Sequence, residues 1–242
     1  MFLRAAFAAV FLASAAQTEC RLALALGLDV SGSVDAREYQ LQLNGLAAAL
    51  TAPEVQDQIL SLPEQPVWIT VFEWAGEDYQ RPMIDWRALR GPDDIARVAT
   101  SLRVQLREPG TTSTAIGSAM EFSSQLFAQR PGCAAYTLDL SGDGINNSGP
   151  LPTSVRTTPP FRGVTINGLI IGSDVTRGRD ERLMEMMELS AYYRRRVIHG
   201  FGAFVEIAEG FEDYERAMTR KLLRETAQIQ IGGLMDGEIR QP

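Results

Sequence analysis

The chain has 242 residues, of which 45% are hydrophobic, and its formal net charge at pH 7 is −7. This length and composition are enough to bury one large core or at most two small ones. The acidic balance, with no basic stripe interleaved with aromatic residues, argues against nucleic-acid binding and against attraction to anionic membranes.

The first 16 residues have the pattern of a signal peptide. Met1-Phe2-Leu3-Arg4 gives a short positive start, residues 5–12 form an apolar core, and residues 13–16 are small residues suited to cleavage. The apolar stretch is too short to span a bilayer, although an uncleaved anchor is the alternative. We expect removal near residue 15 or 16 and export as a periplasmic or secreted protein, without membrane insertion.

The apolar run at residues 22–28 predicts a strand that is buried on both faces, as in a parallel sheet. It ends in Asp29-x-Ser31-x-Ser33, and helical spacing predicts a helix over residues 35–51. Ligands bind at this carboxyl edge in open α/β sheets. One carboxylate and two hydroxyls suit Mg²⁺ or Mn²⁺ better than zinc or copper. The alternative is that these side chains only cap the helix.

The middle of the chain predicts a hairpin followed by two helices. Residues 67–74 are rich in β-branched and aromatic residues and predict a strand, and residues 80–86 predict its antiparallel partner. Pro82 places that second strand at the sheet edge. A helix begins at Asp93. The next helix follows a Thr-rich loop at residues 109–114, which by itself is better explained as an N-cap.

The last part of the chain repeats the opening pattern. Residues 136–140 predict a buried strand that ends in Ser141-Gly142-Asp143-Gly144, so a second carboxylate reaches the carboxyl edge. The remaining predicted elements are strands at 164–172 and 203–208 and helices at 179–196, with Leu183, Met187 and Ala191 facing inward, and at 211–228. Strands alternating with helices indicate a three-layer α/β domain with a mostly parallel sheet and one antiparallel edge strand.

Two cysteines, Cys20 and Cys133, each precede an apolar strand. If those strands are neighbours in a parallel sheet, both thiols meet at its amino edge, opposite the polar loops. A disulfide there would close a loop of more than a hundred residues, a stabilisation of up to about 4–5 kcal/mol in the chain-entropy model. Export favours this bridge over two free buried thiols.

Taken together, three separated loops resemble the von Willebrand factor A domain and its metal-ion-dependent adhesion site. They are Asp29-x-Ser31-x-Ser33, a loop threonine, and Ser141-Gly142-Asp143-Gly144. Thr114-Ala115-Ile116-Gly117-Ser118-Ala119 matches the family's Thr-x-x-Gly-x-Ala pattern, which favours Thr114 over Thr111 or Thr112. The chain departs from the family in having Ser-Gly-Asp-Gly where Thr-Asp-Gly is usual, and Ser113 where a glycine usually precedes the threonine.

The resemblance covers roughly residues 20–230 and extends to a group of secreted bacterial von Willebrand A-like proteins whose biochemical role is unassigned. It implies a Rossmann-like fold with the first and fourth strands side by side, which would make Cys20 and Cys133 neighbours. The implied domain spans residues 20–232 and leaves a C-terminal tail at 233–242.

The resemblance also implies a function. In that family the serines and the threonine bind a cation directly or through water, and the aspartates bind it or hold its waters. The partner supplies the last ligand. The implied cofactor is Mg²⁺ or Mn²⁺, and the implied partner is an unidentified protein that presents an Asp or Glu carboxylate. The implied metal ligands are Asp29, Ser31, Ser33, Thr114 and Asp143.

Two other functions remain as alternatives to this non-enzymatic one. The first is a Mg²⁺-dependent phosphate-ester hydrolase of the haloacid-dehalogenase kind, with Asp29 as nucleophile and Asp143 as metal ligand. Such enzymes need a carboxylate where Ser31 stands, and the chain's one lysine, Lys221, lies on the last helix. His199 is the sole histidine and no Gly-x-Ser-x-Gly elbow is present, which disfavours a hydrolase triad. The second is a structural module whose metal site has lapsed.

Overall fold

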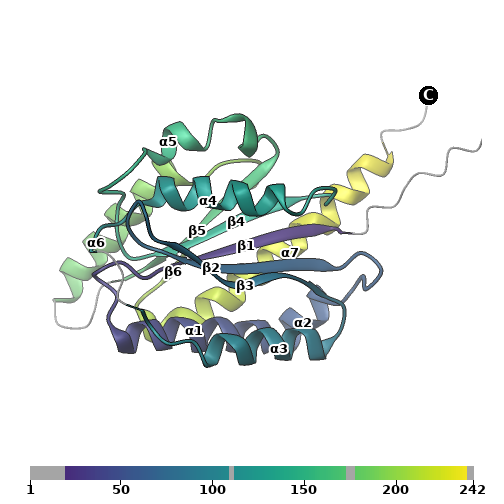
Figure 1. The fold of residues 1–242 in the computed structure, drawn as a ribbon, viewed down its shortest axis with the longest axis horizontal. Coiled ribbons are helices and arrows are strands. Elements are labelled where there is room, and N and C mark those ends of the chain that lie inside the picture. The colour runs from purple at the N-terminus through teal and green to yellow at the C-terminus, as the bar shows by residue number, and fades with distance from the viewer. Residues whose placement is uncertain (1–19, 109–111, 173–177, 239–242) are drawn as a thin grey trace, which may run out of the picture.

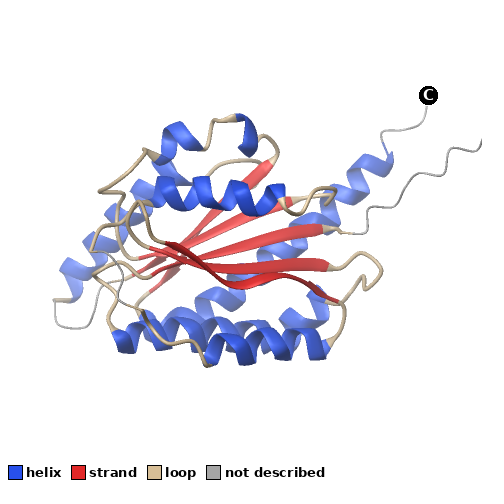
Figure 2. Ribbon diagram, viewed as in Figure 1, coloured by secondary structure: helices blue, strands red, loops and turns tan. Residues whose placement is uncertain are grey.

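The computed structural model describes residues 20–108, 112–172 and 178–238, with side chains described as far as residue 227. A six-stranded sheet lies between two layers of helices (Figures 1 and 2). The strands are β1 (Leu22–Asp29), β2 (Val67–Trp74), β3 (Gln80–Leu89), β4 (Tyr136–Gly142), β5 (Val164–Ile171) and β6 (Val205–Ala208). The helices are α1 (Ala36–Thr51), α2 (Pro53–Ile59), α3 (Pro92–Arg103), α4 (Ile116–Ala128), α5 (Pro152–Val155), α6 (Arg179–Tyr192) and α7 (Tyr214–Glu238), and short helical turns lie at Pro159–Phe161, Tyr193–Val197 and Phe211–Asp213.

The strand order is β3-β2-β1-β4-β5-β6, and within this sheet β3 alone runs antiparallel to its neighbour. The predicted fold class is therefore confirmed, including the antiparallel edge strand. β1 pairs with β2 on one side and with β4 on the other, as expected for the first and fourth strands. All eight residues of β1 are buried, because helices cover both faces of this inner strand.

The two faces of β1 build two different cores. Its leucines at 22, 24, 26 and 28 pack with α1, α3 and α7 below the sheet as Figure 1 is drawn. Ala23 and Ala25 point to the other face, where α4 and Tyr193 lie. Alternation along the strand is thus the alternation of large and small residues rather than of apolar and polar ones.

A disulfide joins Cys20 and Cys133, with a Cα–Cα distance of 4.6 Å. The two cysteines lie just before β1 and β4, at the amino edge of the sheet, where the sequence predicts the bridge. Ala134 N donates to Cys20 O at 2.9 Å and Ala135 N donates to Arg21 O at 3.2 Å, so backbone pairing continues beside the bridge. The strands that end in Asp29 and lead into Asp143 are therefore covalently linked at their opposite ends.

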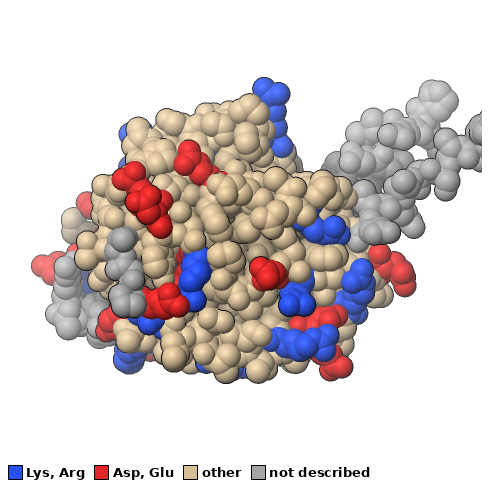
Figure 3. All heavy atoms as spheres, viewed as in Figure 1, with Lys and Arg blue, Asp and Glu red and all other residues tan. Residues whose placement is uncertain are grey.

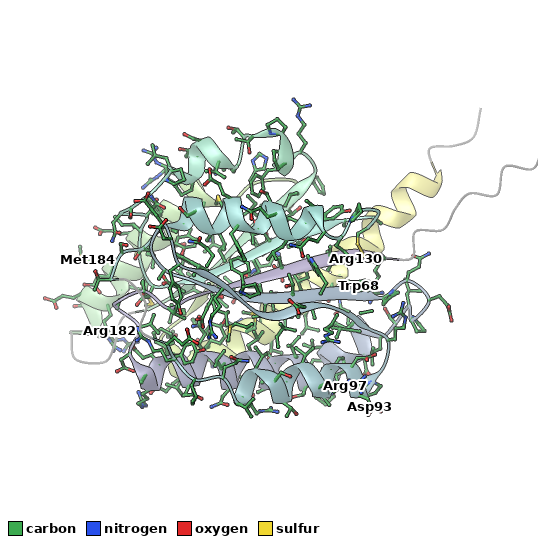
Figure 4. The ribbon with its side chains drawn as sticks, in the orientation of Figure 1. Trp68, Asp93, Arg97, Arg130, Arg182 and Met184 are labelled. Carbon is green, nitrogen blue, oxygen red and sulfur yellow. A yellow bond between two sulfur atoms is a disulfide. The ribbon has the colours of Figure 1, made fainter. Side chains whose placement is uncertain are left out.

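The prediction for residues 179–196 is wrong in two respects. The α-helix ends at Tyr192, and a five-residue π-helical turn, Tyr193–Val197, follows it. Leu183 and Met187 are 52% and 64% exposed and Ala191 is half-buried, although all three were predicted to face inward. The first half of α6 extends past the ends of the strands, so no sheet surface lies beneath it, and Met184 points outward there (Figures 1 and 4).

The last helix is longer than predicted. α7 runs to Glu238 rather than residue 228, so the expected tail begins inside it, although glycines such as Gly232 and Gly233 ordinarily end a helix. The predicted signal peptide at residues 1–16 lies outside the described residues. Across the described part of the chain, no helix has the length and apolarity needed to cross a membrane.

The surface carries both signs of charge. Figure 3 shows small groups of acidic and basic side chains scattered over one face rather than a continuous basic surface. Near the amino edge, Arg130 stacks on the ring of Trp68 at 3.7 Å (Figure 4).

Candidate metal centre

Two of the three predicted loops meet directly at the carboxyl edge of the sheet. Ser33 Oγ, on the loop after β1, donates to Asp143 Oδ1, on the loop after β4, at 2.7 Å. The hydroxyls of Ser31 and Ser33 lie 3.2 Å apart. The pairing of β1 with β4 brings these loops together, because parallel neighbours end at the same edge.

Asp29 is the most deeply placed member of the set. Its side chain is fully buried, and its Oδ1 accepts from the backbone N–H of Ser31 at 2.8 Å. Gln42, on α1, donates to the Asp29 carbonyl oxygen at 3.1 Å. The second carboxylate oxygen of Asp29 has no hydrogen-bond partner among the described residues. A buried carboxylate oxygen left in this way is costly unless a ligand completes it.

Thr114 joins the cluster from the third loop. It is buried, and it is tied to the loop after β4 in both directions: Asn147 Oδ1 accepts from Thr114 N, and Asn147 N donates to Thr114 O, each at 2.9 Å. A Cβ on Gly144 would lie 3.5 Å from Thr114 Oγ1, which places this hydroxyl beside the Asp143 loop. Thr111 lies outside the described residues.

Helix capping does not account for these side chains. Helix α1 is capped by Asp35, whose carboxylate accepts from the N–H groups of Arg37 and Glu38, and Glu38 completes a capping box. The N-cap of α4 is Ala115, with no side-chain cap. The oxygens of Asp29, Ser31, Ser33 and Thr114 are therefore not engaged in starting either helix.

Two glycines permit the close approach of the loops. A Cβ on Gly32 would lie 2.9 Å from the Cα atom of Thr112, so any side chain there would push the first loop from the Thr-rich loop. A Cβ on Gly142 would lie 2.9 Å from Asp29 Oδ2. Larger residues at these positions would separate the donors that the strands bring together.

The electrostatics of the cluster favour an added positive charge. Burial and the nearby Asp143 carboxylate together raise the pKa of Asp29 to about 8, against the hydrogen bonds from Ser31. Burial also raises the pKa of Asp143. The two carboxylates are thus held close together in a poorly hydrated place with hydroxyls as neighbours.

The donor chemistry fits a hard divalent cation. In the described part of the chain, no three His, Cys, Asp or Glu side chains are grouped as metal ligands. The cluster instead combines two carboxylates with three hydroxyls, a set of oxygen donors suited to Mg²⁺ or Mn²⁺. The unpartnered Asp29 oxygen also favours a ligand here, because a carboxylate oxygen has two lone pairs and can hold a cation as well as accept one hydrogen bond.

Sequence reasoning missed the residues that support this cluster. Asn146 and Asn147 tie the loop after β4 to the start of α4, since Asn146 Oδ1 accepts from Gly117 N at 3.1 Å. Tyr192 and Tyr193 approach the same loops from α6. An Asn pair and tandem tyrosines are visible in the sequence, but their partners lie on other elements and only the fold identifies them.

Comparisons with solved structures identify the fold. The proximal thread matrix protein 1 of the mussel byssus, in a structure described as having a zinc-occupied MIDAS motif, is 18% identical, with a TM-score of 0.55 over 86% of this chain and 46% of that chain. A von Willebrand factor type A protein from Catenulispora acidiphila is 15% identical, with a TM-score of 0.52 over 87% of this chain and 43% of that one. The conserved hypothetical protein BatB from Bacteroides thetaiotaomicron is 14% identical, with a TM-score of 0.51 over 86% and 99%.

These likenesses confirm the predicted von Willebrand A-like fold and, at such identities, show the fold alone. This chain spans less than half the length of the mussel protein. No curated protein matches the sequence. One family model, described as a protein of unknown function (DUF1194), matches residues 19–230. The chain therefore belongs to the DUF1194 family and has the von Willebrand A fold.

Proposed function

We propose that this protein is an exported adhesion-type module that binds a partner protein through a divalent cation at the carboxyl edge of its sheet. The carrying observation is that donors from separate loops converge there while none is needed as a helix cap. Asp29, Ser31, Ser33, Thr114 and Asp143 would hold the ion, which we propose to be Mg²⁺ or Mn²⁺. When bound, the cation would supply a positive charge for an Asp or Glu carboxylate of the partner, which would be its last ligand.

The low negative charge of the five donors supports a cation that binds a further ligand from a partner, rather than one enclosed by this chain alone. Three of the five side chains are neutral hydroxyls, so the proposed cation keeps part of its charge and favours a further anionic ligand. Ser33 is exposed and Asp143 is half-buried, which leaves the cluster open to a partner on that side. The mussel structure with a zinc-occupied MIDAS motif supports a divalent ion in this fold and makes zinc a further ion to test.

The disulfide supports the proposed compartment. Disulfides persist in oxidising environments such as the bacterial periplasm or the cell exterior. The Cys20–Cys133 bridge is therefore consistent with export, as is the signal-like pattern of residues 1–16.

Catalysis by Asp29 receives no support from the site. Lys221, the sole lysine, is fully buried against Asp139 and Glu225 and cannot serve a phosphate at the metal loops. Ser31 stands two residues after Asp29, where a hydrolase of this kind needs its second carboxylate.

Calorimetric titration with Mg²⁺, Mn²⁺ and Zn²⁺ tests the metal site. We expect one ion per chain, with binding lost in Asp29→Ala and retained in Asp78→Ala. Asp78 is a matched control because it is an exposed carboxylate in the turn after β2, at the same edge of the sheet. A wild-type chain that binds none of the three ions has a lapsed site, and the proposal is then wrong.

Capture from a periplasmic extract tests the partner. The full chain is immobilised, and bound proteins are compared in Mg²⁺ and in EDTA, with Asp29→Ala as the second bait. We expect a partner that is retained only by the wild-type bait in Mg²⁺. Retention that is equal in EDTA would show binding through another surface.

A further inference from the structure

Two consecutive tyrosines lie where α6 passes into an unusual turn next to the metal loops. Helix α6 ends at Tyr192, and Tyr193 begins the π-helical turn, in which Ile198 N donates to Tyr193 O at 3.0 Å. Arg156 fixes the turn from α5's end by donating to the carbonyl oxygens of Ile198 and Arg195, at 2.5 and 3.1 Å. Such wide turns are rare and occur frequently at functional sites.

The two hydroxyls reach two different metal loops. The hydroxyl of Tyr192 accepts from the backbone N–H of Asn146 at 3.3 Å, on the loop that carries Asp143. The hydroxyl of Tyr193 lies next to Asp29, since a Cβ on Gly142 would be 2.9 Å both from this hydroxyl and from Asp29 Oδ2. The Tyr193 hydroxyl and Asp29 Oδ2 therefore both lie close to one point beside Gly142, at the end of β4.

Two glycines make room for the Tyr193 ring. Besides Gly142, Gly168 on β5 lies directly under it, because a Cβ there would come within 2.6 Å of Tyr193 Cδ1. The Tyr193 side chain is fully buried in the core on the α4 side of the sheet. Small residues on two neighbouring strands thus leave room for the phenol of Tyr193 beside the Asp29 carboxylate.

Both of these polar atoms lack a partner within the described ranges. The Tyr193 hydroxyl and Asp29 Oδ2 are buried, and neither makes a hydrogen bond to the residues described. A phenol supplies one donor and a carboxyl oxygen can accept a hydrogen bond, so the two are chemically complementary. Leaving each unsatisfied would cost free energy that pairing them avoids.

We propose that Tyr193 is a positioning residue of the metal centre, whose hydroxyl donates a hydrogen bond to Asp29 Oδ2, directly or through one water. Because Ser31 N already holds Oδ1, this second bond fixes the plane of the Asp29 carboxylate toward the cation. Tyr193 does not itself bind the ion. This inference rests on the proposed function, and it assigns a supporting role that the donor motif does not contain.

Tyr193→Phe tests the role, with Tyr214→Phe as matched control. Tyr214 is equally buried, and its hydroxyl lies 3.0 Å from Ser141 Oγ on the opposite face of β4. Outer hydrogen-bond partners of metal ligands contribute about 10–100-fold to metal affinity, so we expect Mg²⁺ and Mn²⁺ to bind Tyr193→Phe at least ~10-fold more weakly. Affinity in Tyr214→Phe stays at the wild-type value.

A second measurement, made in EDTA, does not depend on the metal. The change in Tm caused by Tyr193→Phe is measured in the wild-type chain and in Asp29→Ala. We expect a smaller change in Asp29→Ala, because the bond is already lost there, whereas a purely structural tyrosine would give equal changes. A wild-type chain that binds no cation overturns both the inference and the proposed function. Wild-type cation binding with equal affinity in Tyr193→Phe, or equal Tm changes, overturns the inference alone.

Discussion

Two acidic centres lie along strand β4, an inner one at Asp139 and an edge one at Asp143, and they differ in whether a side-chain cation pairs with their carboxylates. Asp139, in the middle of the strand, forms an ion pair with Lys221 Nζ at 2.9 Å, and Glu225 holds the same ammonium at 2.6 Å. Asp143, just after the strand, lies near Asp29 among hydroxyls. The first centre contains a cation that pairs with its carboxylates. At the second, Arg107 donates to the backbone carbonyl oxygens of Val30 and Ser31, at 3.3 and 3.5 Å, rather than to a carboxylate.

The inner centre is a structural network. Asn167 donates to Glu225 Oε1 at 2.7 Å and accepts from Phe204 N at 3.1 Å, so β5 and the segment before β6 are tied to α7. Asp139 and Glu225 raise the pKa of Lys221 above its ordinary value although burial opposes this. In the inner centre, the buried carboxylates of Asp139 and Glu225 are paired with a lysine of the same chain. No such ion pair is found for Asp29 or Asp143 among the described residues, which supports an external cation at the edge.

Removing the internal cation should have the largest effect. Lys221→Met leaves Asp139 and Glu225 buried without a counter-charge, so we expect a loss of about 3–5 kcal/mol in the free energy of unfolding. Urea denaturation measures it. The control is Arg224→Met, three residues later on α7. Arg224 and Lys221 both lie over the Phe204 ring, at 3.8 and 4.9 Å, but Arg224 is exposed. Equal losses in the two variants would contradict a structural ion network.

An added cation should stabilise the folded chain only through the edge centre, which is formed by Asp29, Asp143 and the neighbouring hydroxyls. At a Mg²⁺ concentration 100 times Kd, linkage adds about 2.7 kcal/mol to the free energy of unfolding of the wild type. We expect no gain in Asp29→Asn, and we expect Mg²⁺ to stabilise Lys221→Met as much as the wild type without restoring its loss. Denaturation with and without Mg²⁺ measures all three. A gain in Asp29→Asn would place the ion elsewhere.

The edge centre should also respond to pH. Burial and the Asp143 carboxylate raise the pKa of Asp29 to about 8, above its ordinary value of 3.8, so the folded chain binds this proton more tightly than the unfolded chain. Its contribution to stability is therefore complete below about pH 4 and is lost as the pH rises towards about 8. The slope from one such group is at most about 1.4 kcal/mol per pH unit.

Stability in EDTA between pH 5 and pH 8 (a range set by the ordinary and raised pKa values) tests this sign. Asp29→Asn lacks this contribution, so its stability should fall less steeply as the pH rises. Asp139, whose pKa is raised to about 7 by burial and by Glu225 against Lys221, is present in both proteins. Parallel curves would show that Asp29 is not the titrating group.

The smallest effect is expected at the exposed hydroxyl. Ser33→Ala removes an exposed hydrogen bond to Asp143 and the contact with the Ser31 hydroxyl, and we expect a change of about 1 kcal/mol in the metal-free free energy of unfolding. Calorimetry should nevertheless show weaker Mg²⁺ binding. Ser124→Ala, which removes a hydroxyl bonded only within α4, is the control and should leave Mg²⁺ binding intact. Unchanged Mg²⁺ affinity in Ser33→Ala would remove Ser33 from the proposed site.

The parts of the molecule that the sequence predicts are those encoded locally. A buried parallel strand is a continuous apolar run, and its donors follow within a few residues, so β1 and Asp29-x-Ser31-x-Ser33 are recognisable together. The inner centre is different, because Asp139 stands between leucines and pairs with Lys221 on α7, while Asn167 on β5 bonds to Glu225 on the same helix. No periodicity marks such a pair.

The error in α6 has a related cause. Helical spacing places Leu183 and Met187 on one face, but spacing says nothing about whether a sheet lies beneath that face. The π-helical turn begins at Tyr193, whose ring lies over Gly168 of β5 and whose hydroxyl lies beside Gly142 at the end of β4. The tyrosine's neighbours follow from topology and turn type, neither of which a repeating pattern contains.

The burial of Lys221 has a practical consequence, because no other lysine exists in the chain. Reagents that acylate primary amines have no lysine to modify while α7 is seated on the sheet. The rate at which Lys221 is acylated therefore reports how often that helix lifts away, and mass spectrometry of one peptide is enough to read it.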